Sequence, residues 1–285
     1  HIQIYFLNWL SRVMRMRTFV LLAASVALFE RHPASAFSPS GFSSRHSFPT
    51  KIFASEGVDN GDIFTPLRKI LDQVTGGGTT ATDTPAFLED AAIDECKVVL
   101  NAAVETKSKD PELVVSSLES LEKLMRKKCR AEPEAVSELL TALDGDWRLV
   151  FTTGTADTQK KIGAKVNYFP IKAMQSFRTA AEPMEIENGI YLGDFAVIKF
   201  FGDFEFNPKS RKVEFDFDRI AVLGLTINLG KGDAAALGAA SGLGSENNVK
   251  LVEKKKKPFF NWISADDTIA TARGGGGGLA LWKRV

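Results

Sequence analysis

The chain has 285 residues and a formal net charge of +1, a length that corresponds to about two domains at ~150 residues each. Residues 1–56 hold six of its 36 Lys and Arg and two of its 35 Asp and Glu, so the remainder carries a net charge of −3. All three histidines, His1, His32 and His46, also lie in that segment. The remainder therefore has neither the basic excess of a nucleic-acid binder nor the histidine of Ser-His-Asp, Cys-His and His-ligated metal sites.

The first 36 residues have the order of parts that is typical of a secretory signal peptide. Arg15 and Arg17 precede an apolar stretch at 18–28, which is too short to span a bilayer. The small-residue site Ala34-Ser35-Ala36 follows. We therefore predict a signal peptide over residues 1–36; the alternative interpretation is a buried core helix.

A second targeting segment is predicted directly after the cleavage site. Residues 37–55 are rich in Ser and contain no Asp or Glu, the composition of a transit peptide, which we assign to 37–56. A signal peptide joined in this way to a transit peptide that begins with Phe resembles the bipartite presequence of algae with secondary, red-lineage plastids, such as diatoms. We expect translation to start at Met14 or Met16, so that residues 1–13 are non-native.

The segment between the presequence and the first predicted strand is helical in pattern. Residues 57–86 are predicted to form a linker with a short amphipathic helix at 62–74, and further helices follow within 87–143. Proline at or near the first helical position marks the starts at Thr84-Pro85, Asp110-Pro111 and Glu132-Pro133. Cys96 and Cys129 fall in these helices. They are too few for a Cys₄ metal site, and we expect free thiols, with a regulatory disulfide as the alternative.

The pattern changes to strands at LDGDWRLVFTTG, residues 143–154. After an Asp-Gly turn, Trp147, Leu149 and Phe151 alternate with polar or smaller residues, which is the period of a half-buried strand. Nine strands are predicted, at 147–152, 171–179, 184–192, 195–206, 211–218, 220–229, 259–264, 268–273 and 279–285. Short strands without intervening helices favour an antiparallel barrel. The predicted fold class is therefore α+β, with N-terminal helices followed by a barrel over residues 144–285.

Residues 230–258 interrupt the strands with a Gly- and Ala-rich segment, for which we expect a mobile flap or insertion at the barrel mouth. The segment ends in four consecutive lysines, Lys254, Lys255, Lys256 and Lys257. Together with Phe259 and Phe260 they suit contact with an anionic lipid surface, and the alternative is a solvated loop that prevents edge pairing. The glycines at 274–278 precede no helix, so a hairpin connection is expected there instead of a phosphate-binding loop.

The predicted strands are rich in phenylalanine. The residues that we expect to line the barrel interior are Phe151, Phe195, Val213, Phe215 and Phe217. A closed barrel of about eight strands either fills its interior with side chains or holds one small ligand. The aromatic residues fit both alternatives, because they would pack in a filled core or line an apolar site.

Several segments resemble the plastid lipid-associated proteins, which are also called fibrillins or plastoglobulins. The resemblance rests on residues 143–154, on Gln175-Ser176-Phe177, on the strands around Phe215 and on TIATARGGGGGLALWKRV at 268–285. It extends over about residues 87–285. It implies a lipocalin-like barrel preceded by helices, and a plastid location on plastoglobules or thylakoids.

The same resemblance implies binding of apolar molecules such as carotenoids, quinones or lipids, in a family with no established catalytic residues. We expect no enzymatic activity, no cofactor and no metal. Two alternatives stay open. The first is a structural or assembly protein that docks on thylakoid membranes or photosynthetic complexes. The second is a lipid-modifying enzyme that uses carboxylates with Tyr168 or Tyr191. A cavity lined by Phe215 and Phe217 would favour the carrier over a filled structural barrel.

By analogy with lipocalins, we predict that Arg273 lies over the ring of Trp147 and closes one end of the barrel by a cation–π contact of ~1 kcal/mol. The two residues belong to the two ends of the family resemblance, residues 143–154 and 268–285, which are expected to pair as neighbouring strands of one barrel. One departure from the family pattern lies here, since the family usually follows the terminal Arg-Gly with an Asp and Arg273 is followed only by glycines.

Overall fold

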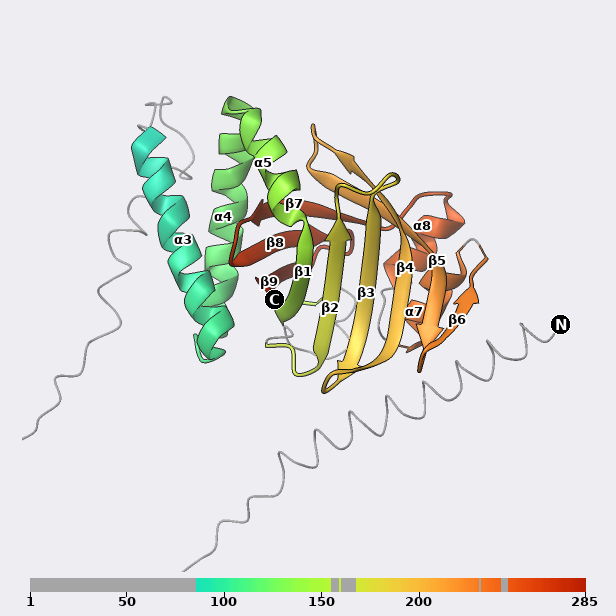
Figure 1. The fold of residues 1–285 in the computed structure, drawn as a ribbon. Helices are drawn as coiled ribbons and strands as arrows, with labels where there is room; N and C mark the ends of the chain where they lie inside the picture. The colour runs from blue at the N-terminus through green and yellow to red at the C-terminus, as the bar shows by residue number, and fades with distance from the viewer. Residues whose placement is uncertain (1–85, 155–158, 160–167, 231, 242–245) are drawn as a thin grey trace, which may run out of the picture. The chain divides into compact units, whose positions relative to one another are not determined.

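The computed structural model describes residues 86–154, 159, 168–230, 232–241 and 246–285 (Figure 1). These belong to one compact unit, Thr82–Val285. The predicted signal and transit peptides and the predicted helix at 62–74 lie outside the described residues. Among those that are described, no helix is both long enough and apolar enough to cross a bilayer.

Three helices precede the sheet: α3 (Ala86–Thr106), α4 (Pro111–Ala131) and α5 (Glu134–Leu143). The start predicted at Asp110-Pro111 is confirmed. The Asp110 carboxylate accepts hydrogen bonds from the backbone N–H groups of Glu112 and Leu113, and Pro111 occupies the first turn, where its missing N–H costs nothing.

The sheet closes on itself. Its strands are β1 (Gly145–Thr152), β2 (Lys172–Arg178), β3 (Glu185–Leu192), β4 (Phe195–Asn207), β5 (Lys212–Val222), β6 (Leu225–Asn228), β7 (Phe259–Ala265), β8 (Ile269–Gly274) and β9 (Leu279–Arg284). Hydrogen bonding follows the order β4-β3-β2-β1-β9-β8-β7-β5, and β5 pairs back with β4. All pairings are antiparallel, and β6 adds to β5 outside this ring. The predicted α+β fold with an antiparallel, lipocalin-like barrel is confirmed.

The turn between β5 and β6 lies farther along the chain than the sequence pattern indicated. The prediction ended the strand at Asp218, whereas β5 continues to Val222, which pairs with Leu225. The two residues between them, Leu223 and Gly224, have φ values of 51° and 87°. A two-residue turn with both central φ angles positive fits the twist of a hairpin, but leucine at such a position gives no sequence signal.

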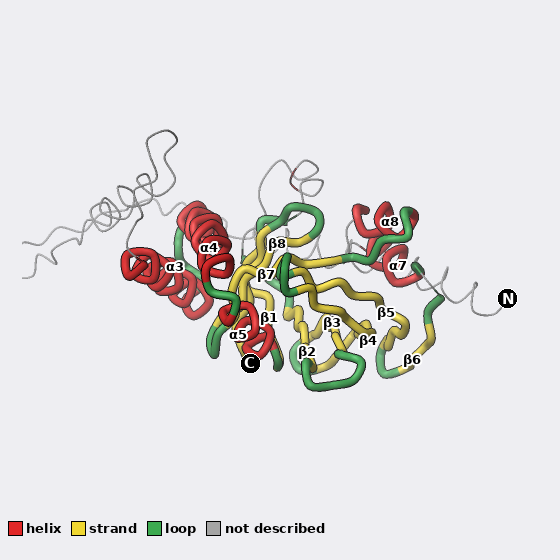
Figure 2. Tube along the Cα trace, turned by 90° about the horizontal axis from the view of Figure 1, so that it is seen from above, coloured by secondary structure: helices red, strands yellow, loops and turns green. Residues whose placement is uncertain are grey.

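Two apolar cores result, one on each side of the strands. Outside the barrel, α3 and α4 pack on β1, β7, β8 and β9 (Figures 1 and 2). Inside it, the strands enclose a second core, and α5 adds Leu139 and Leu143 at one end. The register shift between Leu149 and Phe151 is a bulge in β1. Because a bulge inserts a residue, Phe151 faces the helices, and the predicted alternation with Trp147 is broken there.

The two cysteines lie apart in the helix pair. Cys96 is buried in the core of α3 and α4, and burial, followed by the neighbouring Glu95 charge, raises its pKa to about 11. Lys128 of α4 pairs with Asp90 of α3, which puts Cys129 near the level of Asp90. Six residues of helix, about 9 Å, separate Asp90 from Cys96. A disulfide between the two cysteines would need a Cα separation below ~7 Å, so both remain free thiols in this fold.

The segment predicted as a flap is helical. It contains α7 (Asp233–Ser241) and α8 (Glu246–Glu253), which lie on the opposite side of the barrel from α3 and α4 (Figure 2). The sequence analysis did not predict these helices, because the Gly and Ala content was interpreted as flexibility. Ala is the best helix former, and Ala234 and Leu237 are buried.

Candidate functional site

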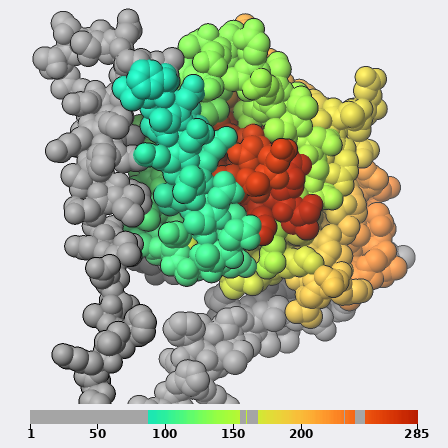
Figure 3. Space-filling view, turned by 60° about the vertical axis from the view of Figure 1, so that its left-hand side comes forward, coloured from blue at the N-terminus to red at the C-terminus, as the bar shows by residue number. Residues whose placement is uncertain are grey.

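One end of the barrel is closed by α5, Trp147 and the last strand. The Trp147 ring is fully buried, and its Nε1–H donates to the carbonyl oxygen of Leu143 at 2.8 Å. The guanidinium of Arg284 lies 4.2 Å from the centre of this ring and donates to the carbonyls of Ala142 and Asp144. Figure 3 shows the C-terminal segment at the surface between the helices. Arg284 therefore joins α5, β1 and β9 at this end.

The predicted contact between Arg273 and Trp147 is wrong. Trp147 pairs with Arg284 in the β1–β9 ladder, whereas Arg273 lies on β8, opposite Leu279 at the other end of β9. The alternation of β8 also directs Arg273 outward, where its guanidinium makes three hydrogen bonds of 2.6 to 3.0 Å with the Glu122 carboxylate of α4.

The Glu122–Arg273 pair links the helix layer to the mouth of the barrel. Arg273 Nη1 also donates to the carbonyl oxygen of Gly277, at 2.7 Å, in the turn between β8 and β9. Burial alone would raise the pKa of Glu122, but the hydrogen bonds and charge of Arg273 and the charges of Arg126 and Arg211 lower it. The glycine-rich segment is thus a hairpin connection, as predicted, with Gly277 at a φ of 85°.

The half of the barrel next to α5 is filled by aromatic rings. Phe177 meets Trp262 and Phe204 edge-on, with centroid distances of 5.4 and 5.5 Å, and Trp262 lies 5.2 Å from Trp282. Edge-to-face pairs at these distances are favourable beyond the area that they bury. In this half of the interior the rings pack directly against one another.

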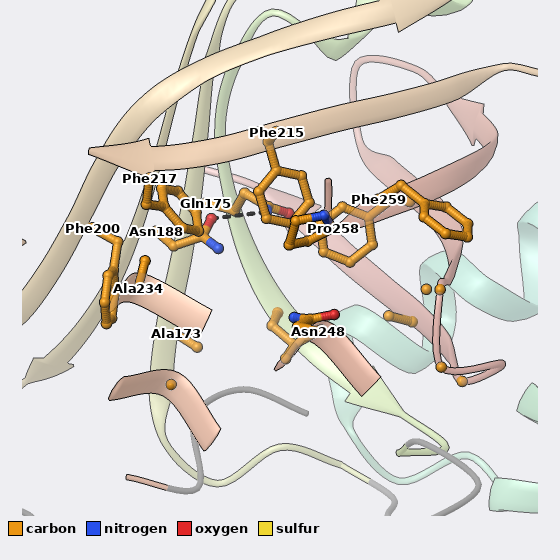
Figure 4. A pocket seen from close by; sticks show the side chains of 18 of the residues that line it. Ala173, Gln175, Asn188, Phe200, Phe215, Phe217, Ala234, Asn248, Pro258 and Phe259 are labelled. Carbon is orange, nitrogen blue, oxygen red and sulfur yellow. Dashed lines mark hydrogen bonds between the residues drawn. The ribbon is translucent and has the colours of Figure 1, made fainter. Parts of the chain in front are cut away.

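The other half holds a cavity of about 430 Å³ (Figure 4). Its walls are mainly apolar and come from β1, β2, β3, β4, β5, β7, β9 and the segment after Gly230, including Leu149, Ala173, Ile190, Phe200, Phe215, Phe217, Phe260, Ala280 and Trp282. Beside them, α7 and α8 contribute Ala234, Ala235 and Val252. This volume lies within the range of ~300 to 1,000 Å³ that is usual for small-molecule sites.

The cavity exists because β5 and β7 pair over a short distance. Their ladder covers only 212–214 on β5, after which β5 continues alongside β4 and β6 alone. Residues of α7 and α8 line the cavity on this side, so the segment after Gly230 forms part of the wall. The predicted position of this segment, at the barrel mouth, agrees with the contribution of α7 and α8 to the cavity wall.

The family comparison agrees with this architecture. A family model described as PAP_fibrillin matches residues 97–282, which is more than half of the chain. The chain belongs to the PAP/fibrillin family. No curated protein sequence matches it. As a plastid lipid-associated fibrillin, the protein has a plastid location implied by its family, and the resemblance stated from residues 143–154 and 268–285 is confirmed.

Two of the residues predicted to line the interior of this fibrillin line the cavity. Phe215 and Phe217 do so (Figure 4). Phe151 faces α3 and α4, and Val213 is buried in the aromatic core of the filled half. Phe195 is 57% exposed at the turn between β3 and β4. The expectation was wrong for Phe151 and Phe195, because alternation reveals neither the bulge in β1 nor the strand end. Val213 does lie inside the barrel, as expected, but away from the cavity lining.

The residues predicted to contact lipid lie in two different environments. Phe260 stacks on Phe215 at 5.3 Å, and the Phe259 ring centre lies 4.9 Å from the Lys212 ammonium; both residues line the cavity. The four lysines before Pro258 are exposed, and Lys257 pairs with Glu205 at 2.6 Å. Their role at a lipid surface stays a prediction.

Sequence reasoning missed the polar part of the lining. Gln175 on β2 is 5% exposed and lies opposite Asn188 on β3, and its Nε2–H donates to Asn188 Oδ1 at 2.8 Å (Figure 4). Gln175 Oε1 is buried and has no hydrogen-bond partner in the described part of the chain. A buried acceptor left in this state costs about 1–3 kcal/mol. Its position in QSF, two residues from buried Phe177, could have indicated an inward side chain.

The lining gives little support to the enzyme alternative. Among the described residues, Asp216 is the only acidic one that contributes to it, and the alternation of β5 directs the Asp216 side chain away from Phe215 and Phe217. Tyr168 donates to the carbonyl oxygen of Lys109 on the helix side, and Tyr191 lies beneath the ammonium groups of Lys172 and Lys199. Neither tyrosine lines the described cavity.

Proposed function

We propose that this fibrillin is a non-catalytic binding module that holds one apolar molecule, of the carotenoid, quinone or lipid kind, in the cavity of its barrel. The observation that carries the proposal is the contrast between a filled half and an open half of one closed barrel. The open half is lined by Phe200, Phe215, Phe217 and Ala280. Such a lining stabilises an apolar guest by removing its surface from water, at about 25 cal/mol per Å².

The family and the N-terminal sequence together support a proposal for the cellular setting. We propose that the protein works at plastoglobules or at the thylakoid surface of a secondary, red-lineage plastid. The family supports the plastid, and the signal peptide at 1–36 followed by the transit peptide at 37–56 supports the plastid type.

Contact with a lipid surface is supported by exposed apolar residues at the cavity end of the barrel. Leu192 and Phe195 occupy the β3–β4 turn, and Leu223 and Leu225 occupy the β5–β6 turn, with 54% to 71% of each residue exposed. The two turns lie side by side, since the Leu223 N–H donates to the carbonyl oxygen of Val197. A carrier that approached a lipid surface with these turns would present the cavity end to its ligand's source.

A second function, as a structural or assembly protein on thylakoid membranes or photosynthetic complexes, is favoured by the same exposed turns. It would not need the cavity. The two functions therefore differ in whether filling the cavity matters.

The test is extraction and mass spectrometry of molecules that co-purify with the chain from residue 57 onward. Ala173→Trp places an indole in the cavity, and we expect the co-purified pigment or lipid to fall at least fivefold relative to the wild type. Ala221→Trp, on β5 and outside the lining, is the matched control and should retain the ligand. Equal recovery from both variants would exclude the cavity as the binding site and favour the structural alternative.

A further inference from the structure

The Gln175–Asn188 pair restricts the chemistry of the cavity's occupant. One amide hydrogen of Gln175 is used by Asn188, and the Gln175 carbonyl oxygen Oε1 is left as an unpaired acceptor among the described residues. Figure 4 shows both residues among those that line the cavity, together with Phe200, Phe215 and Phe217. Oε1 itself is covered by neighbouring atoms, so an occupant reaches it when the Gln175 side chain turns toward the cavity. Buried side-chain oxygens in folded proteins are almost always paired, so an occupant that donates a hydrogen bond here is favoured.

The rest of the lining limits the donor to a neutral group. An ammonium ion in the cavity would be desolvated without a facing carboxylate, because Asp216 contributes to the wall from a strand position that points outward. A hydroxyl group has no such cost. It can donate to Gln175 Oε1 and also accept the second N–H of the Gln175 amide, so both polar functions of this side chain would be used.

We propose that the cavity selects an otherwise apolar alcohol or phenol, whose hydroxyl donates to Gln175 Oε1 while its apolar body lies against Phe200, Phe215 and Phe217. Hydrocarbons, and compounds whose oxygen atoms only accept, leave Gln175 Oε1 unpaired and bind more weakly. This inference rests on the proposed carrier function, and it adds a rule for which apolar molecules are bound.

A matched set of probes tests the rule on the full chain. 4-Nonylphenol, its methyl ether and nonylbenzene share one apolar body and differ in whether they donate a hydrogen bond. Their dissociation constants are measured by displacement of the apolar dye N-phenyl-1-naphthylamine. We expect 4-nonylphenol to bind about tenfold more tightly than either of the others. Equal affinities for all three would overturn the hydroxyl rule and leave the carrier function standing, whereas absence of binding by all three would count against the carrier function itself.

Variants of Gln175 test whether this side chain causes the preference for 4-nonylphenol. In Gln175→Leu we expect the ratio of affinities to fall to about one, with the affinity for nonylbenzene kept or raised. Thr152→Val is the control, because the Thr152 hydroxyl also lines the cavity but already donates to the carbonyl oxygen of Leu279 at 3.1 Å. A tenfold preference that persists in Gln175→Leu would overturn the assignment. Should that variant fail to fold, Gln175→Met, which is unbranched like glutamine, makes the same comparison.

Discussion

The two halves of the barrel interior are built by the same strands and differ in the size of the side chains at their inward positions. On β2, the inward residue changes from Phe177 beside α5 to Gln175 and then Ala173 toward the mouth. On β9, it changes from Trp282 to Ala280. A closed barrel of this size can be filled or hollow, and here the choice is made residue by residue along each strand. The half next to α5 therefore contributes more to the stability of the fold, and the other half leaves space for a bound molecule.

The largest effect is expected for Trp147→Ala in the filled half. The substitution removes a fully buried indole, its hydrogen bond to Leu143 and its contact with Arg284, and should cost about 4 kcal/mol in free energy of unfolding. Urea denaturation measures it. Phe217→Ala is the comparison, because that half-buried ring already borders open space, and its loss should cost no more than about 2 kcal/mol. Equal costs for the two variants would contradict the division of the interior.

A smaller effect, and one that depends on pH, is expected at the pair that ties α4 to the barrel. Glu122→Gln should reduce the free energy of unfolding by about 1–2 kcal/mol at pH 7, since Glu122 is only 11% exposed and Arg273 is 31% exposed. The folded-state pKa of Glu122 lies below its ordinary value of 4.5, so the pair's contribution is complete above that pH. The contribution is lost as the pH falls through the lowered pKa.

The measurement is the difference in stability between wild type and Glu122→Gln from pH 7 to pH 3. It should be constant down to about pH 4.5 and shrink below it. Glu119, on the same helix, is exposed and acts on Arg273 only through its charge, so Glu119→Gln should change the free energy of unfolding by less than about 0.5 kcal/mol throughout. A difference that grows as the solution is acidified would contradict the sign of the pKa shift.

The smallest effect on stability is expected at the exposed turns. Leu225→Ser should change the free energy of unfolding by less than about 0.5 kcal/mol, because Leu225 is 68% exposed. If the turns contact lipid, the same substitution should lower co-flotation with vesicles of neutral lipid severalfold. Val285→Ser, whose valine is 72% exposed at the C-terminus, is the matched control and should float as the wild type does. Unchanged flotation of Leu225→Ser would remove these turns from the proposed surface.

Much of the fold could be predicted because its signals are local. Proline after Asp110 starts α4, and alternating apolar residues mark the strands within a few positions of their observed bounds. The site could be predicted only in part. Phe215 and Phe217 were found, but the register shift that turns Phe151 outward depends on how β1 pairs with β9.

The sequence by itself determined the helices before residue 143, the strands apart from the β5–β6 turn, the change at residue 143 and the family, since each depends on residues close together in the chain. It did not determine α7 and α8. Only the tertiary structure decided which arginine covers Trp147. Arg284 and Arg273 lie on paired strands, and their distances from Trp147 are set by ladder register. Tertiary structure also decided that half the barrel stays open. That outcome depends on the summed volume of side chains from many strands, with α7 and α8 contributing to the wall, which no local pattern records.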